Sequence, residues 1–574
     1  MKILGRFLPA LLAALVSGGA MILLFPPFHL PWLVWLIFVP VLLALWSQPP
    51  KRRRRRSFLI GWAMGAAGFI GIFSWLLTVT WAGWLAVSIY LGLFPAIWAA
   101  FTATLADPRR DPKGNTWSGA VRRSFWVAAM WCGTEWLRGW LFTGFGWNDI
   151  GVAFHQTPLF AQAADLFGIA GLSFVPVFVQ SIAVQALMRQ RSGDERVKGK
   201  PLYDLAVAML LVTAVVGYGR WRISSYGKQE AVRLKALMVQ LNIPQTAGKR
   251  EMAPEEVHMN YEDETLGAFE SLPANKRPDW VIWPEGALSG WLLRMPDNST
   301  TMARQNVDTL QTIHEGTGDF TTIMGLSEVE AERMGDQVVM KKDAKFWNSM
   351  VVLPAKGGVE TFRKHHLVIF GEYIPFIEQL PWLAKIYEQQ ANGEKYGGSF
   401  ARGEGFEPLP ADVGSNQVQI IPTVCFEDSV GRLVRKFTRD APQVIVNVTD
   451  DGWFQQSIGA EQHFANARFR AIELRRPLIR CANTGVTAAV DTLGLTLSPA
   501  QSGVHQELRD TDGKTFLRGH LLTEVDIPKH PVSTLYAAIG DWGVIAGALL
   551  SFFWAWLYAR IHREIGPEPV EFFG

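Results

Sequence analysis

The chain has 574 residues, of which 49% are hydrophobic and only 19% are charged, against roughly 25% charged residues in an average soluble protein. Its 24 Trp and 35 Phe residues exclude a disordered chain. Three cysteines exclude a disulfide-rich scaffold and a zinc site built from four cysteines. The net charge of +3 does not indicate nucleic-acid binding, and we expect no nucleic-acid partner, because the basic residues cluster in short stretches between apolar segments.

The charges are unevenly distributed along the first hundred residues. No Asp, Glu, Lys or Arg lies between Arg6 and Lys51, and residues 57–106 contain none either. Because a bilayer crossing needs only about 20 apolar residues, these two segments predict an integral membrane protein. A signal peptide is the alternative for the first apolar stretch. However, a second apolar stretch follows almost at once, and no clean small-residue cleavage site precedes it.

Eight apolar segments are predicted to cross the membrane as helices. They are residues 7–25, 32–46, 57–79, 84–105, 125–142, 167–188, 205–218 and 542–558. The basic run 51–56 follows the second segment, and loops rich in Lys and Arg stay in the cytoplasm. Both termini are therefore predicted to be cytoplasmic. Glu135 and Arg138 lie in the fifth segment and are interpreted as an ion pair inside the bundle, with contact at headgroup level as the alternative.

The sequence after the seventh predicted span has ordinary charge density and alternates β-type runs with helical stretches. The runs are LKALMVQL, DWVIWP, FTTIMGL, NSMVVLP, VQIIPTVCF and QVIVNVT, and 461–474 has helical spacing. Such alternation predicts one α/β domain. The predicted organisation is a membrane bundle of seven helices at 1–227, an outward-facing α/β domain at 228–528, and a C-terminal transmembrane helix with a cytoplasmic tail at 529–574.

Three strand-like runs each end in a reactive group. VIWP leads to Glu285, TFR leads to Lys364, and IPTV leads to Cys425. Strand ends can converge at one edge of a sheet, where a carboxylate could take the thiol proton and an ammonium could stabilise the thiolate and then an oxyanion.

Each of the three residues also has a simpler explanation. A lone Cys is usually a small buried hydrophobic residue, and a lone Glu or Lys is usually a solvated surface residue. Cys425 and Cys481 could instead form a disulfide in an oxidising compartment. We predict that they do not, because a nucleophile must be unpaired.

The motifs around these residues resemble a known family. VIWPEGAL, KHHLVIFGEYIP and IPTVCFED, followed by residues 447–491, are similar to the apolipoprotein N-acyltransferases, bacterial inner-membrane enzymes that complete lipoprotein maturation. EWLRGWLFTGFGWNDIG at 135–151 and TLYAAIGD at 534–541 are also similar to that family. The resemblance implies that the outward domain has the αββα sandwich of the nitrilase, or carbon–nitrogen hydrolase, superfamily.

The same resemblance assigns roles to individual residues. It implies that Glu285 is the general base, that Lys364 stabilises the oxyanion, and that Cys425 is the nucleophile. Glu372 matches a second glutamate that shapes the catalytic pocket. Phe426 and Glu427 match positions beside the nucleophile and are predicted to contact the substrate.

The reaction implied by the resemblance is a ping-pong acyl transfer. Cys425 would take an acyl chain from a glycerophospholipid, expected to be phosphatidylethanolamine, and pass it to the α-amino group of the diacylglyceryl-cysteine of an apolipoprotein. No metal or organic cofactor is implied. The expected enzyme is a monomer in the bacterial inner membrane, with its catalytic domain in the periplasm.

Two other classes of protein are weighed against this hypothesis. A membrane-anchored amidase would need only one anchoring helix, whereas eight spans are predicted. A transporter would be expected to carry ionisable residues in several spans, whereas the first four predicted spans contain no Asp, Glu, Lys or Arg.

Overall fold

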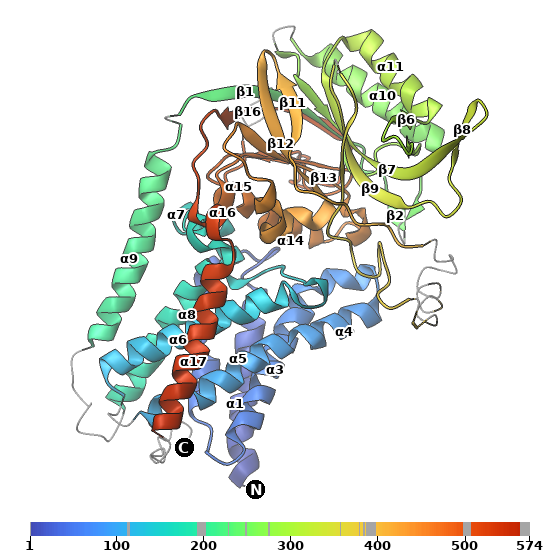
Figure 1. Ribbon diagram of the computed structural model, residues 1–574. Coiled ribbons are helices and arrows are strands. Elements are labelled where there is room, and N and C mark those ends of the chain that lie inside the picture. The colour runs from blue at the N-terminus through green and yellow to red at the C-terminus, as the bar shows by residue number, and fades with distance from the viewer. Residues whose placement is uncertain are drawn as a thin grey trace. The chain divides into compact units, whose positions relative to one another are not determined.

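The computed structural model describes residues 2–111, 115–191, 202–227, 229–246, 249–273, 276–355, 357–377, 379, 380, 382, 385, 388, 398–497 and 507–562. The chain divides into two compact units (Figure 1). Unit 1 comprises Met1–Tyr226 and Thr534–Gly574, and unit 2 comprises Gly227–Ser533. The predicted cytoplasmic tail beyond residue 562 lies outside the described residues.

Unit 1 is helical, and each of the eight predicted membrane segments overlaps a helix. The helices are α1 (Lys2–Ile22), α2 (Val39–Trp46), α3 (Arg53–Ile72), α4 (Trp81–Leu91), α5 (Leu93–Thr104), α6 (Trp117–Arg138), α7 (Pro158–Ala161), α8 (Ala164–Gln190), α9 (Tyr203–Ser224), α16 (Leu535–Ile539) and α17 (Trp542–Ile561). Short 3-10 segments lie between them, namely η1 (Pro31–Trp35), η2 (Ser74–Thr78), η3 (Pro108–Arg110), η4 (Leu141–Thr143) and η5 (Ile150–Gln156). Because α17 packs against α6, unit 1 is built from both ends of the chain.

Four stretches in the described part of unit 1 are long and apolar enough to cross a membrane. They are Trp81–Arg110, Ala164–Gln190, Tyr203–Ser224 and Trp542–Ile561. Phe7–Ile22 and Pro31–Trp46 are apolar but shorter. These helices are those of a membrane protein by length and composition, and the number of eight crossings stays a prediction.

Glu135 and Arg138 are both buried in α6, but the predicted ion pair between them is wrong. Arg138 pairs with Asp149, whose Oδ1 lies 2.5 Å from Nη2. Glu135 Oε1 instead accepts a hydrogen bond of 2.8 Å from the N–H of Ile150. Both side chains therefore attach α6 to the irregular segment that follows it. These partners matter because a buried charge without one would be costly.

Unit 2 contains two β-sheets. The larger has the order β10-β9-β7-β4-β1-β16, with β5, β6 and β8 paired beside this path, and the smaller has the order β11-β12-β13-β14-β15. The strands of the larger sheet are β1 (Ala231–Gln240), β4 (Trp280–Ile282), β5 (Leu292–Arg294), β6 (Thr300–Met302), β7 (Thr321–Met334), β8 (Gln337–Met340), β9 (Phe346–Leu353), β10 (Glu360–Arg363) and β16 (Gly519–Pro528). Those of the smaller sheet are β11 (Leu409–Val413), β12 (Asn416–Val424), β13 (Gln443–Thr449), β14 (Leu478–Ala482) and β15 (Ala488–Val490), and β2 (Gln245–Thr246) pairs with β3 (Lys249–Arg250). All six predicted β-type runs fall on strands.

The two sheets pack face to face, and helices cover them. The Cys481 Sγ on β14 lies 3.2 Å from the carbonyl oxygen of Ile282 on β4, across the interface between the sheets. On the larger sheet lie α10 (Pro254–Ser271) and α11 (Arg304–Thr317), which Figure 1 shows on its outer side. On the smaller sheet lie α14 (Gly459–Ala467) and α15 (Phe469–Leu474). This order of layers is the αββα sandwich expected from the sequence.

The sequence of α10 explains how such a helix forms and packs. Pro254 occupies the first turn, where it costs no hydrogen bond, and two glutamates beside it favour the positive end of the helix dipole. Val257, Tyr261 and Ala268 are buried at helical spacing and join the core with the larger sheet.

The direction of the strands determines where in unit 2 a site can form. β12, β13 and β14 run parallel, as do β1, β4 and β7. Parallel strands place their carboxyl ends at one edge of a sheet, where α/β proteins bind their ligands. The residues that follow β4, β12 and β13 therefore lie at the strand ends where a site can form.

Candidate active site

Strand ends bring four predicted site residues together in unit 2. Lys364 directly follows β10, and its Nζ lies 2.9 Å from Glu372 Oε1 and 3.7 Å from Glu285 Oε1. Glu285 follows β4, and Cys425 directly follows β12. Both Lys364 and Glu285 exert an electrostatic effect on the Cys425 thiol. Elements of both sheets thus bring a thiol, an ammonium and two carboxylates together in one place.

The Lys364 side chain is completely buried. Burial alone would lower its pKa, but the surrounding negative groups, with Glu372 first, raise the pKa above its usual value. Lys364 is therefore a permanently charged ammonium at neutral pH. That is the state needed to stabilise negative charge on a substrate.

Cys425 occupies a strained turn between β12 and the 3-10 helix η7 (Cys425–Ser429). Its φ of 57° is in the left-handed region, which costs a non-glycine residue about 1–3 kcal/mol and is typical of functional sites. Burial raises the pKa of the thiol well above its usual value, Glu285 raises it further, and Lys364 opposes them. Cys425 therefore rests as a thiol, because one ammonium faces two carboxylates and a thiolate would add more negative charge.

Asn348, on β9, joins the two carboxylates and was not identified from the sequence. Its Nδ2 donates to Glu285 Oε1 at 2.6 Å and to Glu372 Oε1 at 2.9 Å. The other oxygen of Glu285 accepts the N–H of Asp450 at 3.0 Å. Glu285 is thus held at both oxygens. An Asn at the start of the apolar run NSMVVLP was a usable signal, since an amide partly removed from water needs partners.

Gly325 on β7 allows the chain around Glu285 to pack closely. A Cβ at this position would lie 2.5 Å from Glu285 Cα. Because this neighbour is backbone, any larger residue would displace the strand end that carries the carboxylate.

Glu328 anchors the strand that leads to Lys364. Its carboxylate is completely buried and pairs with Arg363 at 2.7 Å and also with Arg294. Burial would raise the pKa of Glu328, but the two guanidinium groups outweigh it and lower the pKa. This ion pair fixes the residue immediately before Lys364.

Glu427 and Phe426 lie beside Cys425 as expected from the sequence. Glu427 is completely buried, and its carboxylate accepts the N–H groups of His365, His366 and Val424 at 2.8–3.0 Å. Burial raises its pKa to about 7, and Lys364 opposes that rise. Glu427 therefore ties the segment after Lys364 to the nucleophile turn.

Phe426 is half-buried, with its ring centroid 5.8 Å from Lys364 Nζ. It lines the site next to both the nucleophile and the ammonium. The substrate contacts expected of Phe426 and Glu427 stay predictions.

All three cysteines of the chain are free thiols. Cys481 is buried within β14 and is directed toward the larger sheet, as described above. Within the part of the chain that the structure describes, no group of His, Cys, Asp and Glu side chains is arranged to hold a metal ion.

Comparison with known proteins identifies the family. The family profile of the apolipoprotein N-acyltransferase N-terminal domain matches residues 17–182, and that of carbon-nitrogen hydrolase matches residues 236–520. A relative from Rhizobium rhizogenes named apolipoprotein N-acyltransferase is 31% identical over 85% of this chain and 87% of its own length. The chain belongs to the apolipoprotein N-acyltransferase family. The resemblance recognised in its motifs is thereby confirmed.

Other similar proteins extend over nearly the whole chain or over its hydrolase part. Apolipoprotein N-acyltransferase of Geobacter metallireducens is 27% identical over 96% of both chains. The crystal structure of carbon-nitrogen hydrolase from Helicobacter pylori G27 covers 57% of this chain and 92% of that chain, with 13% identity and a TM-score of 0.32.

Proposed function

We propose that this protein transfers a fatty acyl chain from a glycerophospholipid to the α-amino group of the diacylglyceryl-cysteine of apolipoproteins, through a thioester on Cys425. The observation that carries the proposal is the buried Lys364 ammonium, paired with Glu285 and Glu372 beside the Cys425 thiol. Its membership in the apolipoprotein N-acyltransferase family supports the identity of donor and acceptor.

The first half-reaction acylates the enzyme. As Cys425 Sγ attacks the ester carbonyl carbon, the thiol proton passes to the Glu285 carboxylate, because the thiol is not ionised beforehand. The carbonyl oxygen becomes an oxyanion that Lys364 Nζ and the Phe426 N–H stabilise. When the C–O bond breaks, Glu285 returns the proton to the departing alkoxide oxygen, which leaves as the hydroxyl of the lysophospholipid. A thioester remains on Cys425.

The second half-reaction regenerates the thiol. The free α-amine of the lipoprotein attacks the thioester, Glu285 accepts a proton from the nitrogen, and the collapsing intermediate releases Cys425, which takes that proton back. Asn348 and the Asp450 N–H hold the carboxylate during both transfers. The side chains of Glu285, Lys364 and Cys425 therefore serve both half-reactions, as a ping-pong reaction requires.

We propose that the protein lies in the bacterial inner membrane, with unit 2 in the periplasm and both termini in the cytoplasm. The basic run 51–56 between apolar helices supports this orientation. Reporter fusions after Arg56 and after Ala411 should report opposite sides of the membrane. The same side for both fusions would overturn the orientation.

The activity test uses a phospholipid with a labelled acyl chain and a diacylated lipopeptide with a free α-amine. Wild-type protein should move label to the lipopeptide, and Cys425→Ala should move none because no thioester can form. Cys481→Ala removes the other thiol of unit 2 and should keep the activity. If Cys425→Ala transfers label at the wild-type rate, Cys425 is not the nucleophile.

A further inference from the structure

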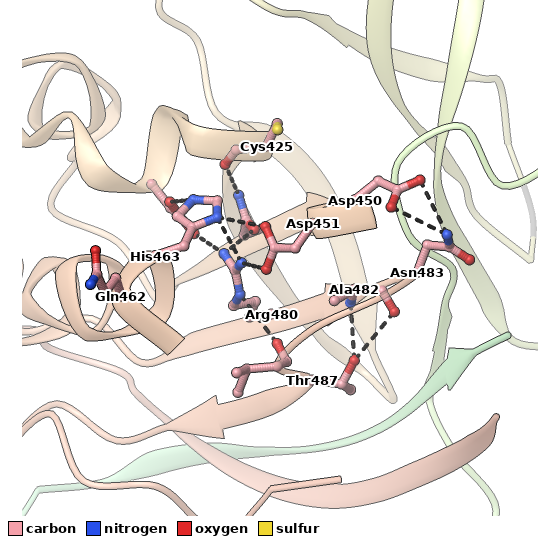
Figure 2. Close-up of polar contacts among 12 residues, drawn as sticks. Cys425, Asp450, Asp451, Gln462, His463, Arg480, Ala482, Asn483 and Thr487 are labelled. Atoms are coloured by element: carbon pink, nitrogen blue, oxygen red, sulfur yellow. Dashed lines mark hydrogen bonds and ion pairs between the residues drawn. The ribbon is translucent and has the colours of Figure 1, made fainter. Parts of the chain in front are cut away.

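A cluster of four charged side chains lies completely buried behind the nucleophile turn. We call Asp428, Asp451, His463 and Arg480 the Arg480 cluster, and all four have 0% relative exposure. They come from η7, from η9 (Asp451–Phe454), from α14 and from β14. Figure 2 shows the Arg480 guanidinium between Asp451 and His463, with Cys425 close by.

The groups of this cluster are fully paired. Arg480 bonds to Asp428 and, at 2.8 Å, to Asp451, while His463 bonds to the same two carboxylates at 2.8 and 2.7 Å. Burial and Arg480 lower the pKa of His463, but the two carboxylates outweigh them and raise it. The guanidinium and the imidazole thus share the same two carboxylates, and Arg480 Nη2 also lies 3.0 Å from His463 Nδ1.

Such a cluster is not explained by stability. Burying ionised groups carries a desolvation cost that well-packed apolar side chains avoid, so apolar replacement of a buried ion-pair set is often neutral or stabilising. A role in positioning the site accounts for the cluster where stability does not.

One amide connects the cluster to the nucleophile. Arg480 Nη1 donates to Asn447 Oδ1 at 3.0 Å, which leaves the Asn447 Nδ2 to donate to the Cys425 carbonyl oxygen at 2.9 Å and to Thr423 Oγ1 at 3.0 Å. Arg480 therefore decides which end of this amide faces Cys425, since a guanidinium only donates hydrogen bonds.

The Cys425 carbonyl belongs to the peptide that also carries the Phe426 N–H. In a planar trans peptide these two groups point in opposite directions. Fixing the carbonyl on Asn447 therefore fixes the direction of the N–H and maintains the left-handed backbone of Cys425.

We propose that Arg480, acting through Asn447, is a positioning residue that orients the peptide between Cys425 and Phe426 for attack on an acyl ester. The inference rests on the proposed function. Asp428, Asp451 and His463 hold the guanidinium in place, and none of them needs to touch the substrate.

The test is Asn447→Ala, which changes no charge and removes the hydrogen bond to the Cys425 carbonyl. Three quantities are measured: the single-turnover rate of acylation by a labelled phospholipid, the KM for that phospholipid, and the alkylation rate of Cys425 with iodoacetamide. Loss of one donor to an oxyanion costs about 10²–10³ in kcat. We expect an acylation rate about 10²-fold lower, with KM and alkylation close to wild type, because alkylation forms no oxyanion.

Arg480→Gln should show the same pattern, and Arg476→Gln is its matched control. Arg476 is also buried, but it bonds mainly backbone carbonyls such as those of Leu474 and Arg439. Should Arg480→Gln fail to fold, Asn447→Ala still decides the question.

The outcomes separate this inference from the proposed function. If wild type acquires a thioester and Asn447→Ala acylates at the wild-type rate, or loses acylation and alkylation in parallel, the positioning role is refuted and the function stands. If wild type acquires no acyl group from phospholipid, the proposed function fails, and the inference fails with it.

Discussion

Replacing Glu285 with Gln should change two reactions of the same thiol in opposite directions. Glu285 raises the pKa of Cys425, so its neutral replacement should increase the fraction of thiolate. The same replacement removes the group that accepts the thiol proton during acylation. The variant should therefore alkylate faster and acylate more slowly.

The size of each effect follows from the charges in the site. Glu285→Gln changes one cation facing two carboxylates into one cation facing one, and removal of one adjacent charge lowers a pKa by about one unit or more. At a pH well below the pKa, a decrease of one pKa unit gives about tenfold more thiolate. Each thiolate is, however, nearly threefold less nucleophilic, for a Brønsted coefficient of about 0.45. Alkylation should rise about threefold to fourfold, and loss of the general base should slow acylation by about 10²–10⁴.

The assay measures iodoacetamide incorporation at pH 8 by peptide mapping and acylation by a labelled phospholipid in parallel samples. Cys132 and Cys481 are buried and serve as internal references. Glu315→Gln, on the exposed surface of α11, is the control for a lost carboxylate. If alkylation of the variant falls together with acylation, Glu285 keeps Cys425 ionised before the substrate reacts. That result would contradict the reasoning above.

Three further substitutions test other parts of the site. Lys364→Ala should slow acylation by about 10²–10³ in the same assay because the oxyanion loses its ammonium, and a smaller loss would give that role to another group. Gly325→Ala should slow acylation by about 10², since displacement of Glu285 by about 1 Å can cost that much; Gly267→Ala, which meets no atom within 4 Å, should not. Glu328→Gln should lower the melting temperature at pH 7, because removing one partner of a buried ion pair costs about 3–5 kcal/mol by leaving Arg294 and Arg363 without their carboxylate. Because the folded pKa of Glu328 is lowered, its contribution is present above the unfolded pKa of about 4.3 and is lost as the pH falls through the folded pKa; a temperature difference between wild type and variant that does not shrink as the pH falls below the unfolded pKa would contradict this assignment.

The sequence predicted the elements that carry the chemistry because local patterns determine them. Continuous apolar runs identified β4 and β12, so the residues directly after them could be recognised as candidates for a site. Family motifs then implied the expected roles of Glu285 and Cys425, which stay predictions. Charge-free segments identified the helices of unit 1, although only four described stretches are long and apolar enough to cross a membrane.

Contacts between side chains that lie far apart in the chain could not be predicted from the sequence. Asn348 contacts Glu285 across 63 positions, and Asp149 replaces Glu135 as the partner of Arg138. No spacing rule predicts such contacts, because the fold alone brings the groups together. A polar residue within a buried strand was nevertheless a signal, and Arg480 within β14 is a second example of it.

The most direct test of the thioester mechanism is the mass of the peptide that contains Cys425. Purified wild-type protein is incubated with a phospholipid of one known acyl chain and then digested. The proposed function predicts that this peptide gains one acyl group, which neutral hydroxylamine removes and which a diacylated lipopeptide with a free α-amine also removes. An acyl group on a different residue, or transfer to the lipopeptide while Cys425 is alkylated, would contradict it.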